Sequence, residues 1–189
     1  MKINLKERGK KILLLIDGIK EGLFPRKLLK DIKEGESKEE ERLRIIEEII
    51  IPYAKEIVLR NLALRDRTEK EIMDILKRKE FSDETIKRVI DDFKNVNLID
   101  DLKTARYIVQ NTKGKSKNEI KFKLKNMGIK DEDIEEILKD YDEVEALKLE
   151  IMKGKKKYKD VKKLFAYLLR KGFDYDEIKR MIGRIDEEY

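Results

Sequence analysis

The sequence predicts an all-α protein of three tandem three-helix repeats in an elongated, curved array, preceded by a small N-terminal extension of a β-hairpin and helices. Two observations predict this class. The same spacing of apolar residues recurs three times, and each copy begins at a residue that can cap a helix. The composition agrees, because 189 residues that are 47% charged and 40% hydrophobic suit small modules better than one large core.

The repeat is visible as three segments of equal length, residues 68–90, 116–138 and 160–182, which align without a gap. In each segment two apolar pairs, with members four residues apart, are separated by a step across a turn. Such pairs lie on one face of a helix, so each segment predicts a helix, a tight turn and a second helix. The apolar anchors are Ile72, Leu76, Phe81, Ile86 and Ile90, then Ile120, Leu124, Ile129, Ile134 and Leu138, then Leu164, Leu168, Phe173, Ile178 and Ile182.

Caps and turns recur with the anchors. The residues at the cap position are Thr68, Ser116 and Asp160. Their side-chain oxygens can accept hydrogen bonds from the first turn of a helix. At the central turn, Gly128 and Gly172 occupy the place where helices commonly end in a left-handed residue, whereas Glu80 departs from it and indicates strain or another geometry. Another helical stretch precedes each cap, at residues 53–64, 102–111 and 146–153, so each repeat has three helices.

Residues 1–51 differ in kind. Residues 11–17 read as a strand, Gly18 as a turn and residues 19–24 as a returning strand. Pro25 then opens a helix through residue 32, and a charged helix covers residues 38–51. Pro52 falls in the first turn of the helix that begins the first repeat. The predicted domains are the N-terminal extension, 1–51, and repeats at 52–99, 100–143 and 144–189.

The sequence offers no residues for familiar catalysis. Without Cys or His it has no disulfide, no thiolate nucleophile and no imidazole base or ligand. Phosphate-binding glycine loops and metalloprotease motifs are also absent. The adjacent acids Asp100 and Asp101 are interpreted as a cap for a helix beginning near Leu102, in preference to a metal or acid–base site. We therefore expect a protein that is not an enzyme and that uses no catalytic residues, metal or cofactor.

The longest apolar run near the N-terminus, residues 12–16, is too short for a signal peptide or a membrane span. We therefore expect a cytoplasmic protein that does not contact the membrane.

Charge patterning is more informative than the net charge of +6. Residues 113–125 contain six Lys and one Glu, and residues 153–163 contain seven Lys and one Asp. Because these runs recur at equivalent repeat positions, before and within the second helix, they predict a basic side that meets phosphates or an acidic protein surface. Residues 131–145, by contrast, hold nine acids. The candidate partner-binding residues are Lys113, Lys115, Lys117, Lys121, Lys155, Lys156, Lys157 and Lys159.

Several motifs resemble the pattern of the RecX family. They are RDRTEKEI at residues 65–72, LKRKEF at 76–81, LID followed by Asp101 and Ala105 at the next junction, and LRKGF at 169–173. The resemblance covers roughly residues 53–185. Glu80 stands where the family usually has Gly, and Thr104 stands where it usually has an aromatic residue.

This resemblance implies a monomeric modulator that docks along the groove of the RecA–DNA filament and inhibits strand exchange, ATP turnover and co-protease function. Two alternatives come from the residues alone. One is a helical-repeat protein whose lysines bind nucleic acid directly, which binding to naked DNA with a steep salt dependence would indicate. The other is a protein–protein scaffold, which binding to neither DNA nor the filament would indicate.

Overall fold

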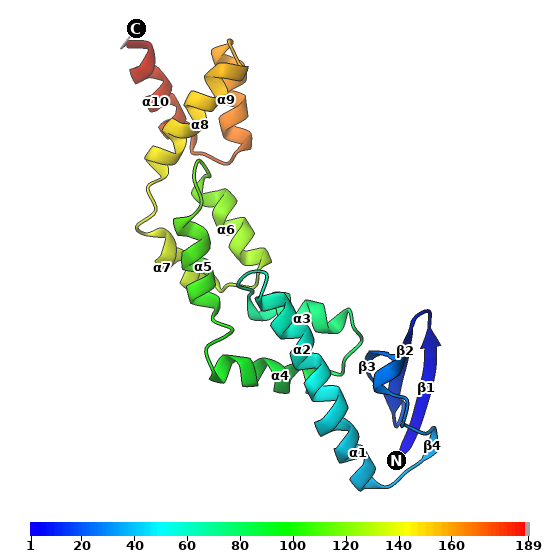
Figure 1. The fold of residues 1–189 in the computed structure, drawn as a ribbon. Helices are drawn as coiled ribbons and strands as arrows, with labels where there is room; N and C mark the ends of the chain where they lie inside the picture. The colour runs from blue at the N-terminus through cyan, green and yellow to red at the C-terminus, as the bar shows by residue number, and fades with distance from the viewer. Residues whose placement is uncertain (188–189) are drawn as a thin grey trace. The chain divides into compact units, whose positions relative to one another are not determined.

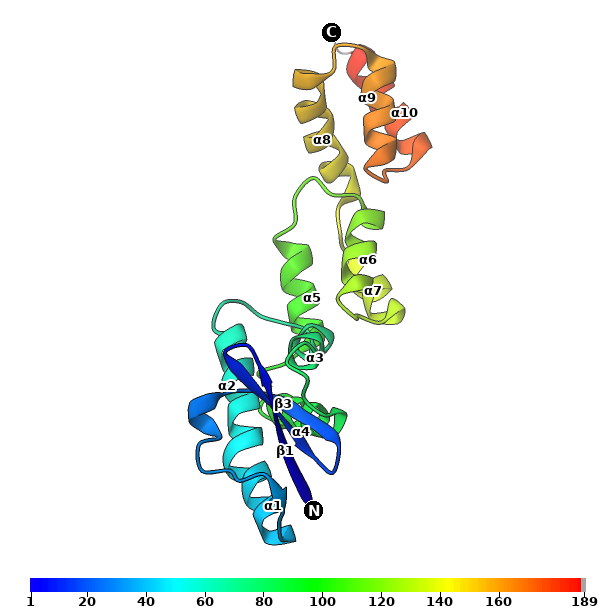
Figure 2. The same cartoon turned by 90° about the vertical axis from the view of Figure 1, so that its right-hand side faces the viewer.

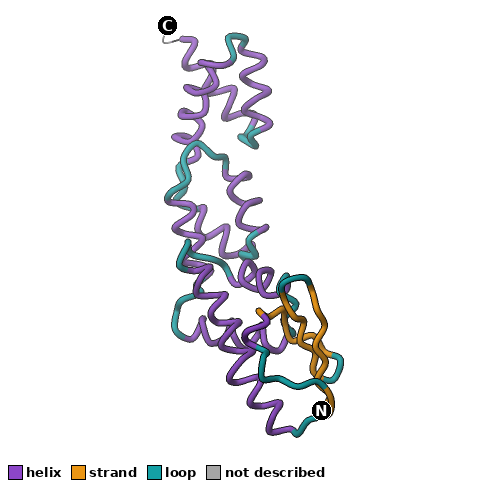
Figure 3. The backbone as a smooth tube through the Cα atoms, turned by 45° about the vertical axis from the view of Figure 1, so that its right-hand side comes forward, coloured by secondary structure: helices purple, strands orange, loops and turns teal. Residues whose placement is uncertain are grey.

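The computed structural model describes the backbone of residues 1–187 and the side chains of residues 1–183. The chain divides into two compact units, Met1–Asp100 and Asp101–Tyr189. The first unit contains all the described strands and the helices α1 to α4, and the second contains α5 to α10 (Figure 1). The protein is mostly helical, with a small sheet at its N-terminus (Figure 3). No helix among the described residues is long and apolar enough to cross a membrane.

The N-terminal sheet contains the expected hairpin and two strands that the sequence analysis missed. The strands are β1 Lys2–Arg8, β2 Lys11–Ile16, β3 Ile19–Pro25 and β4 Gly35–Glu36, in the order β3-β2-β1-β4. All the pairs are antiparallel. Asp17 and Gly18, with φ of 51° and 83°, make the two-residue turn of the hairpin, a conformation that Asp-Gly sequences favour.

The helix expected over residues 25–32 is wrong. Only a short 3-10 helix, η1 Arg26–Leu28, forms there. The N–H groups of Leu29 and Ile32 donate to carbonyls three residues earlier, at 3.1 Å in both cases, so the chain advances in tight turns. These turns bury Leu29 and Ile32 in the core and return the chain to pair β4 with β1. Packing therefore outweighs the local helix preference.

Pro52 lies in the first turn of the helix that begins the first repeat, as expected, but this helix continues without a break from one that starts at Glu39. The continuous helix consists of α1 Glu39–Ile45, a π turn at Ile46–Ile50 and α2 Ile51–Leu62. Pro52 has no N–H to donate to a carbonyl one turn earlier. The wider π turn lies at this place and lets the helix continue past the missing hydrogen bond.

The remaining helices form trios that follow α2. Their bounds are α3 Glu69–Lys77, α4 Asp83–Asn95, α5 Asp101–Gln110, α6 Lys117–Asn126, α7 Asp131–Leu138, α8 Glu143–Lys157, α9 Val161–Arg170 and α10 Tyr175–Glu187. The trios are α2–α4, α5–α7 and α8–α10. All the apolar anchors identified from the sequence are buried. They lie in three hydrophobic clusters, one for each trio, and the first cluster also includes the sheet.

The sheet and the first trio share one core, and Figure 2 shows the strands alongside the helices. Phe24 of β3 packs edge-on against Phe81, with ring centroids 5.7 Å apart. Pairing of β2 with β3 shifts at Glu21, which has no partner in the register. The bulge turns the Glu21 carboxylate toward α4, where the Ser82 hydroxyl donates to it at 2.7 Å. Burial raises the pKa of Glu21.

The central turns of the three trios share a left-handed residue. Its φ is 89° at Gly128 and 83° at Gly172, and Glu80 adopts the same conformation with a φ of 59°. Glu80 therefore takes the strain that glycine avoids. Its carboxylate forms an ion pair with Lys20 at 2.7 Å.

We expect Glu80→Gly to raise the free energy of unfolding by about 0.5 kcal/mol. Relief of the left-handed strain, about 1 to 2 kcal/mol, outweighs the entropy cost of glycine and the loss of a partly exposed ion pair. Urea denaturation followed by circular dichroism measures the change. Glu80→Ala is the control, because it loses the ion pair and keeps the strain. A glycine variant no more stable than the alanine variant would contradict this account of the turn.

Candidate partner-binding surface

The eight predicted lysines all lie in the second unit, but in different local structures. Lys113 and Lys115 precede α6, Lys117 and Lys121 lie on it, and Lys159 lies in the loop before α9. The remaining three, Lys155, Lys156 and Lys157, lie in the final turn of α8. These three precede the second helix of their repeat, as expected, but they belong to the end of the first helix and not to a loop.

Helix α8 continues past its expected end at residue 153 for two physical reasons. Cationic side chains in a last turn interact favourably with the helix dipole. The second reason is that Gly154 does not end the helix. Close packing between α8 and α9 leaves no room for a side chain at this position. A Cβ on Gly154 would come within 2.4 Å of Leu164 Cδ1, so glycine allows α9 to pack closely against α8.

Half of the six lysines of the first run form ion pairs within their own trio. Lys115 pairs with Glu119, and Lys121 of α6 pairs with Glu135 of α7. Lys125, in the same run, pairs with Asp131 at 2.7 Å. The acidic helix α7 thus lies against the basic helix α6, and it compensates two lysines of this run. The hydrogen bond from Lys121 to Glu135 raises the pKa of Lys121.

The second run keeps its positive charge. Its four predicted lysines, Lys155, Lys156, Lys157 and Lys159, are exposed. None of them forms an ion pair with an acid among the described residues. The nearest acid in sequence, Asp160, is engaged as the cap of α9, where it accepts from the Lys162 N–H at 2.7 Å. The surface formed by residues 155–159 is therefore the stronger cationic site of the two.

Hydrogen bonds hold the two trios of the second unit together. The Ser116 hydroxyl, which caps α6, donates to the carbonyl of Lys171 at 2.7 Å. The Asn118 amide donates to the carbonyl of Gly172 at 2.9 Å. A Cβ at Gly172 would lie only 2.9 Å from Ser116 Oγ, so the glycine also permits this close approach. The start of α6 is therefore fixed against the turn between α9 and α10.

A buried carboxylate that the sequence analysis missed lies at the same junction. Glu150 of α8 is only 4% exposed and accepts from the Tyr167 hydroxyl at 2.8 Å and from Lys153 Nζ at 2.9 Å. Burial raises its pKa, but these hydrogen bonds and the charges of Lys153 and Lys171 together outweigh burial and leave the pKa lowered. Burial and the adjacent Glu150 raise the pKa of Tyr167 to about 12. The available signal was an acid on the apolar face of α8, beside Leu147 and Ile151.

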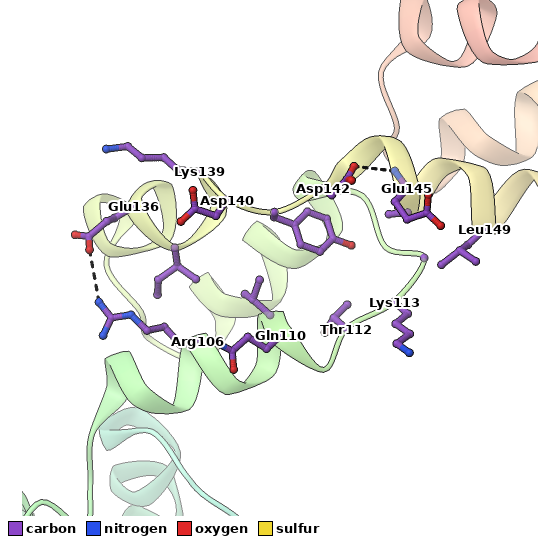
Figure 4. A pocket seen from close by; sticks show the side chains of 15 residues that line it. Arg106, Gln110, Thr112, Lys113, Glu136, Lys139, Asp140, Asp142, Glu145 and Leu149 are labelled. Atoms are coloured by element: carbon purple, nitrogen blue, oxygen red, sulfur yellow. Dashed lines mark hydrogen bonds and ion pairs between the residues drawn. The ribbon is translucent and has the colours of Figure 1, made fainter. Parts of the chain in front are cut away.

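A groove of about 510 Å³ lies between α5, the end of α7 and the start of α8 (Figure 4). Its lining carries both signs of charge, and Arg106 on one wall pairs with Glu136 at 3.5 Å. Tyr141 also lines the groove, and its hydroxyl donates to the carbonyl of Lys115 at 2.7 Å. Among the described residues no group of acids is arranged to hold a metal ion. The groove and the adjacent lysines are suited to binding a partner by charge and shape.

Comparisons with known proteins agree on one family. The model for "RecX, first three-helix domain" matches residues 54–93. "Regulatory protein RecX" of Clostridium perfringens strain 13 is 34% identical over 158 residues, which cover 77% of this chain and 74% of that protein. The protein of the same name from Clostridioides difficile is 33% identical over 168 residues, covering 82% of this chain and 79% of its own.

Solved structures show the same fold. The crystal structure of RecX from Lactobacillus salivarius has a TM-score of 0.62 and 29% identity, and the match covers 72% of this chain and 96% of that one. A second crystal structure, of regulatory protein RecX, has a TM-score of 0.64 with 22% identity, and the match covers 94% of this chain and 97% of the other.

Proposed function

The chain belongs to the RecX family of regulatory proteins, and we propose on this basis that it binds the RecA–DNA filament and inhibits strand exchange, ATP turnover and co-protease function. The observation that carries the proposal is the identity with regulatory RecX proteins over most of both chains. The lysine-rich surface of the second unit supports it, because it provides a binding surface for an anionic assembly. In this proposal the protein acts in the cytoplasm as a monomer and without a cofactor.

We also propose that the three helix trios are tandem repeats of one unit. Their matching local chemistry supports this. The cap residues Thr68, Ser116 and Asp160 each accept a hydrogen bond from a first-turn N–H of the helix that follows. Each trio then has buried anchors at the same spacing and a left-handed residue at the central turn. The domain boundaries and the elongated array expected from the sequence stay predictions.

The proposed contact surface is the set of eight lysines, with the greatest weight on residues 155–159. These side chains are exposed and keep their charge, so a partner gains attraction without first breaking an ion pair. The same observation favours a second candidate function, direct binding of nucleic acid. Contact with phosphates would give affinity that falls steeply with salt.

Co-sedimentation with RecA filaments tests the proposal. We expect the protein to pellet with filaments assembled on single-stranded DNA with a slowly hydrolysed ATP analogue. Binding to the same DNA without RecA should be weaker by at least about tenfold, since the filament supplies protein contacts that naked DNA lacks. Equal binding to DNA with and without RecA would instead establish the nucleic-acid function. Binding to neither would contradict both candidates.

A further inference from the structure

Helix α8 carries an unusual stripe on its outward face. The stripe consists of Glu145, Leu149, Met152 and Lys156, spaced so that they lie along one side of the helix. The opposite face holds Leu147 and Ile151 in the core. Met152 is 66% exposed and lies outside the hydrophobic cluster of its trio, so its side chain contributes little to the core.

The stripe begins inside the groove of Figure 4. Glu145 and Leu149 line the groove, and Lys113 lines the same end of it (Figure 4). The loop that carries Lys113 lies close to α8, since a Cβ at Gly114 would come within 2.8 Å of Glu150 Oε1 and 3.1 Å of Lys153 Nζ. Lys113 therefore lies beside the part of the stripe that lines the groove.

Lysines from both predicted runs thus lie around the apolar centre of the stripe, which consists of Leu149 and Met152. Lys113 comes from the first run, while Lys155 and Lys156 come from the second and lie one helical turn beyond Met152. All three are exposed. The acid of the stripe, Glu145, is partly compensated by Lys148 of the same helix at 3.6 Å. The stripe is therefore apolar at its centre, positively charged at Lys155 and Lys156 and beside Lys113, and acidic at Glu145 where it enters the groove.

We propose that this stripe binds an acidic protein segment that carries one apolar side chain. The apolar side chain packs on Leu149 and Met152, and the carboxylates of the segment pair with Lys113, Lys155 and Lys156. Methionine suits this role because its unbranched, polarisable side chain adapts to different apolar surfaces. The inference rests on the proposed function only for where the segment occurs, which is on the surface of the filament.

A protein segment fits the stripe better than a nucleic acid does. A phosphate backbone would satisfy the lysines but would leave Met152 uncovered. Single-stranded bases bind by stacking on aromatic side chains, and the stripe has no aromatic side chain at its centre. The nearest ring in the groove, Tyr141, is partly buried and its hydroxyl is already bonded to Lys115. Charge and apolar contact together therefore select an acidic segment with an apolar anchor.

The direct test uses protein labelled with ¹³C at its methionine methyl groups. The probe is a peptide of about twelve Asp and Glu residues with one central Leu, compared with an oligothymidylate of similar length. We expect the peptide to shift the Met152 methyl signal and to leave those of Met127 and Met181 in place. Replacing the peptide's Leu with Ser should weaken binding by at least about fivefold. A peptide that leaves Met152 unmoved, or an oligothymidylate that binds more tightly and moves it equally, would overturn the inference.

Matched variants carry the test to the filament. Met152→Gln should weaken filament binding by about fivefold without changing affinity for naked DNA, whereas Phe122→Gln, at another exposed apolar side chain, should have no effect. Lys155→Gln with Lys156→Gln should weaken filament binding more than Lys123→Gln with Lys130→Gln. If Met152→Gln weakened filament binding no more than Phe122→Gln, and the first double lysine variant no more than the second, the inference would be contradicted. A parent protein that does not bind the filament would refute the proposed function alone, because the peptide experiment decides the stripe independently.

Discussion

Leu124→Ala and Leu168→Ala should each lower the free energy of unfolding by roughly 2 to 5 kcal/mol. Both side chains are 0% exposed, and they occupy the same anchor position in the second and third helix trios. Truncation removes apolar contacts and leaves a cavity that close-packed neighbours fill only in part. Because the two residues belong to separate hydrophobic clusters, each substitution tests its own trio. Urea denaturation followed by circular dichroism measures both changes.

The chain offers matched controls for these substitutions. Leu169 is the next residue after Leu168 but is 40% exposed, and Phe122 precedes Leu124 by two positions and is 70% exposed. Leu169→Ala and Phe122→Ala should each cost about 1 kcal/mol or less, since a side chain that already faces solvent in part leaves little or no cavity. Costs below about 0.5 kcal/mol at both anchors would mean that the helices are in the wrong register.

The helical part of the fold could be predicted because its signals are local. The spacing of anchors such as Leu124 and Leu168 follows from helix geometry, and a cap such as Ser116 acts on its own first turn. Elements that depend on packing could not be predicted in this way. Strand β1 is largely polar and is stabilised by pairing with β2, and the chain after Pro25 follows the core instead of its local helix preference.

The candidate site was predictable only in part. The lysine runs are visible in the sequence, but their neutralisation is not. It depends on α7 lying against α6, which brings Glu135 to Lys121. The groove likewise forms only when α5 and α8, far apart in the sequence, come together. Glu150 was missed although it lies on the apolar face of α8, because its burial depends on Tyr167, which comes from another helix.

Charge reversal of five lysines should abolish the proposed inhibition of RecA by this protein. The substitutions are Lys155→Glu, Lys156→Glu and Lys157→Glu together with Lys115→Glu and Lys117→Glu. The three in α8 are exposed and should act on surface charge without harming the core. Lys115 already pairs with Glu119, so reversal there also sets two like charges side by side. We therefore expect the three α8 substitutions alone to cause most of the loss.

The salt dependence of binding identifies what the lysines contact. If they meet phosphates, each lost contact reduces the slope of log affinity against log salt by about 0.9, and affinity for naked DNA falls as well. If they meet carboxylates on RecA, filament binding weakens while affinity for naked DNA barely changes. The stripe on α8 predicts the second outcome for Lys155 and Lys156.

The most direct measurement is RecA-catalysed strand exchange titrated with the parent protein and with the five-lysine variant. Circular dichroism of the variant first establishes that its helices are intact. The account predicts that the parent stops strand exchange as its concentration rises, and that the variant leaves exchange running at the rate seen without it. A parent protein that does not slow exchange at any concentration would contradict the assignment as a RecA inhibitor. A folded variant that inhibits as strongly as the parent would show that the lysines are not the contact surface.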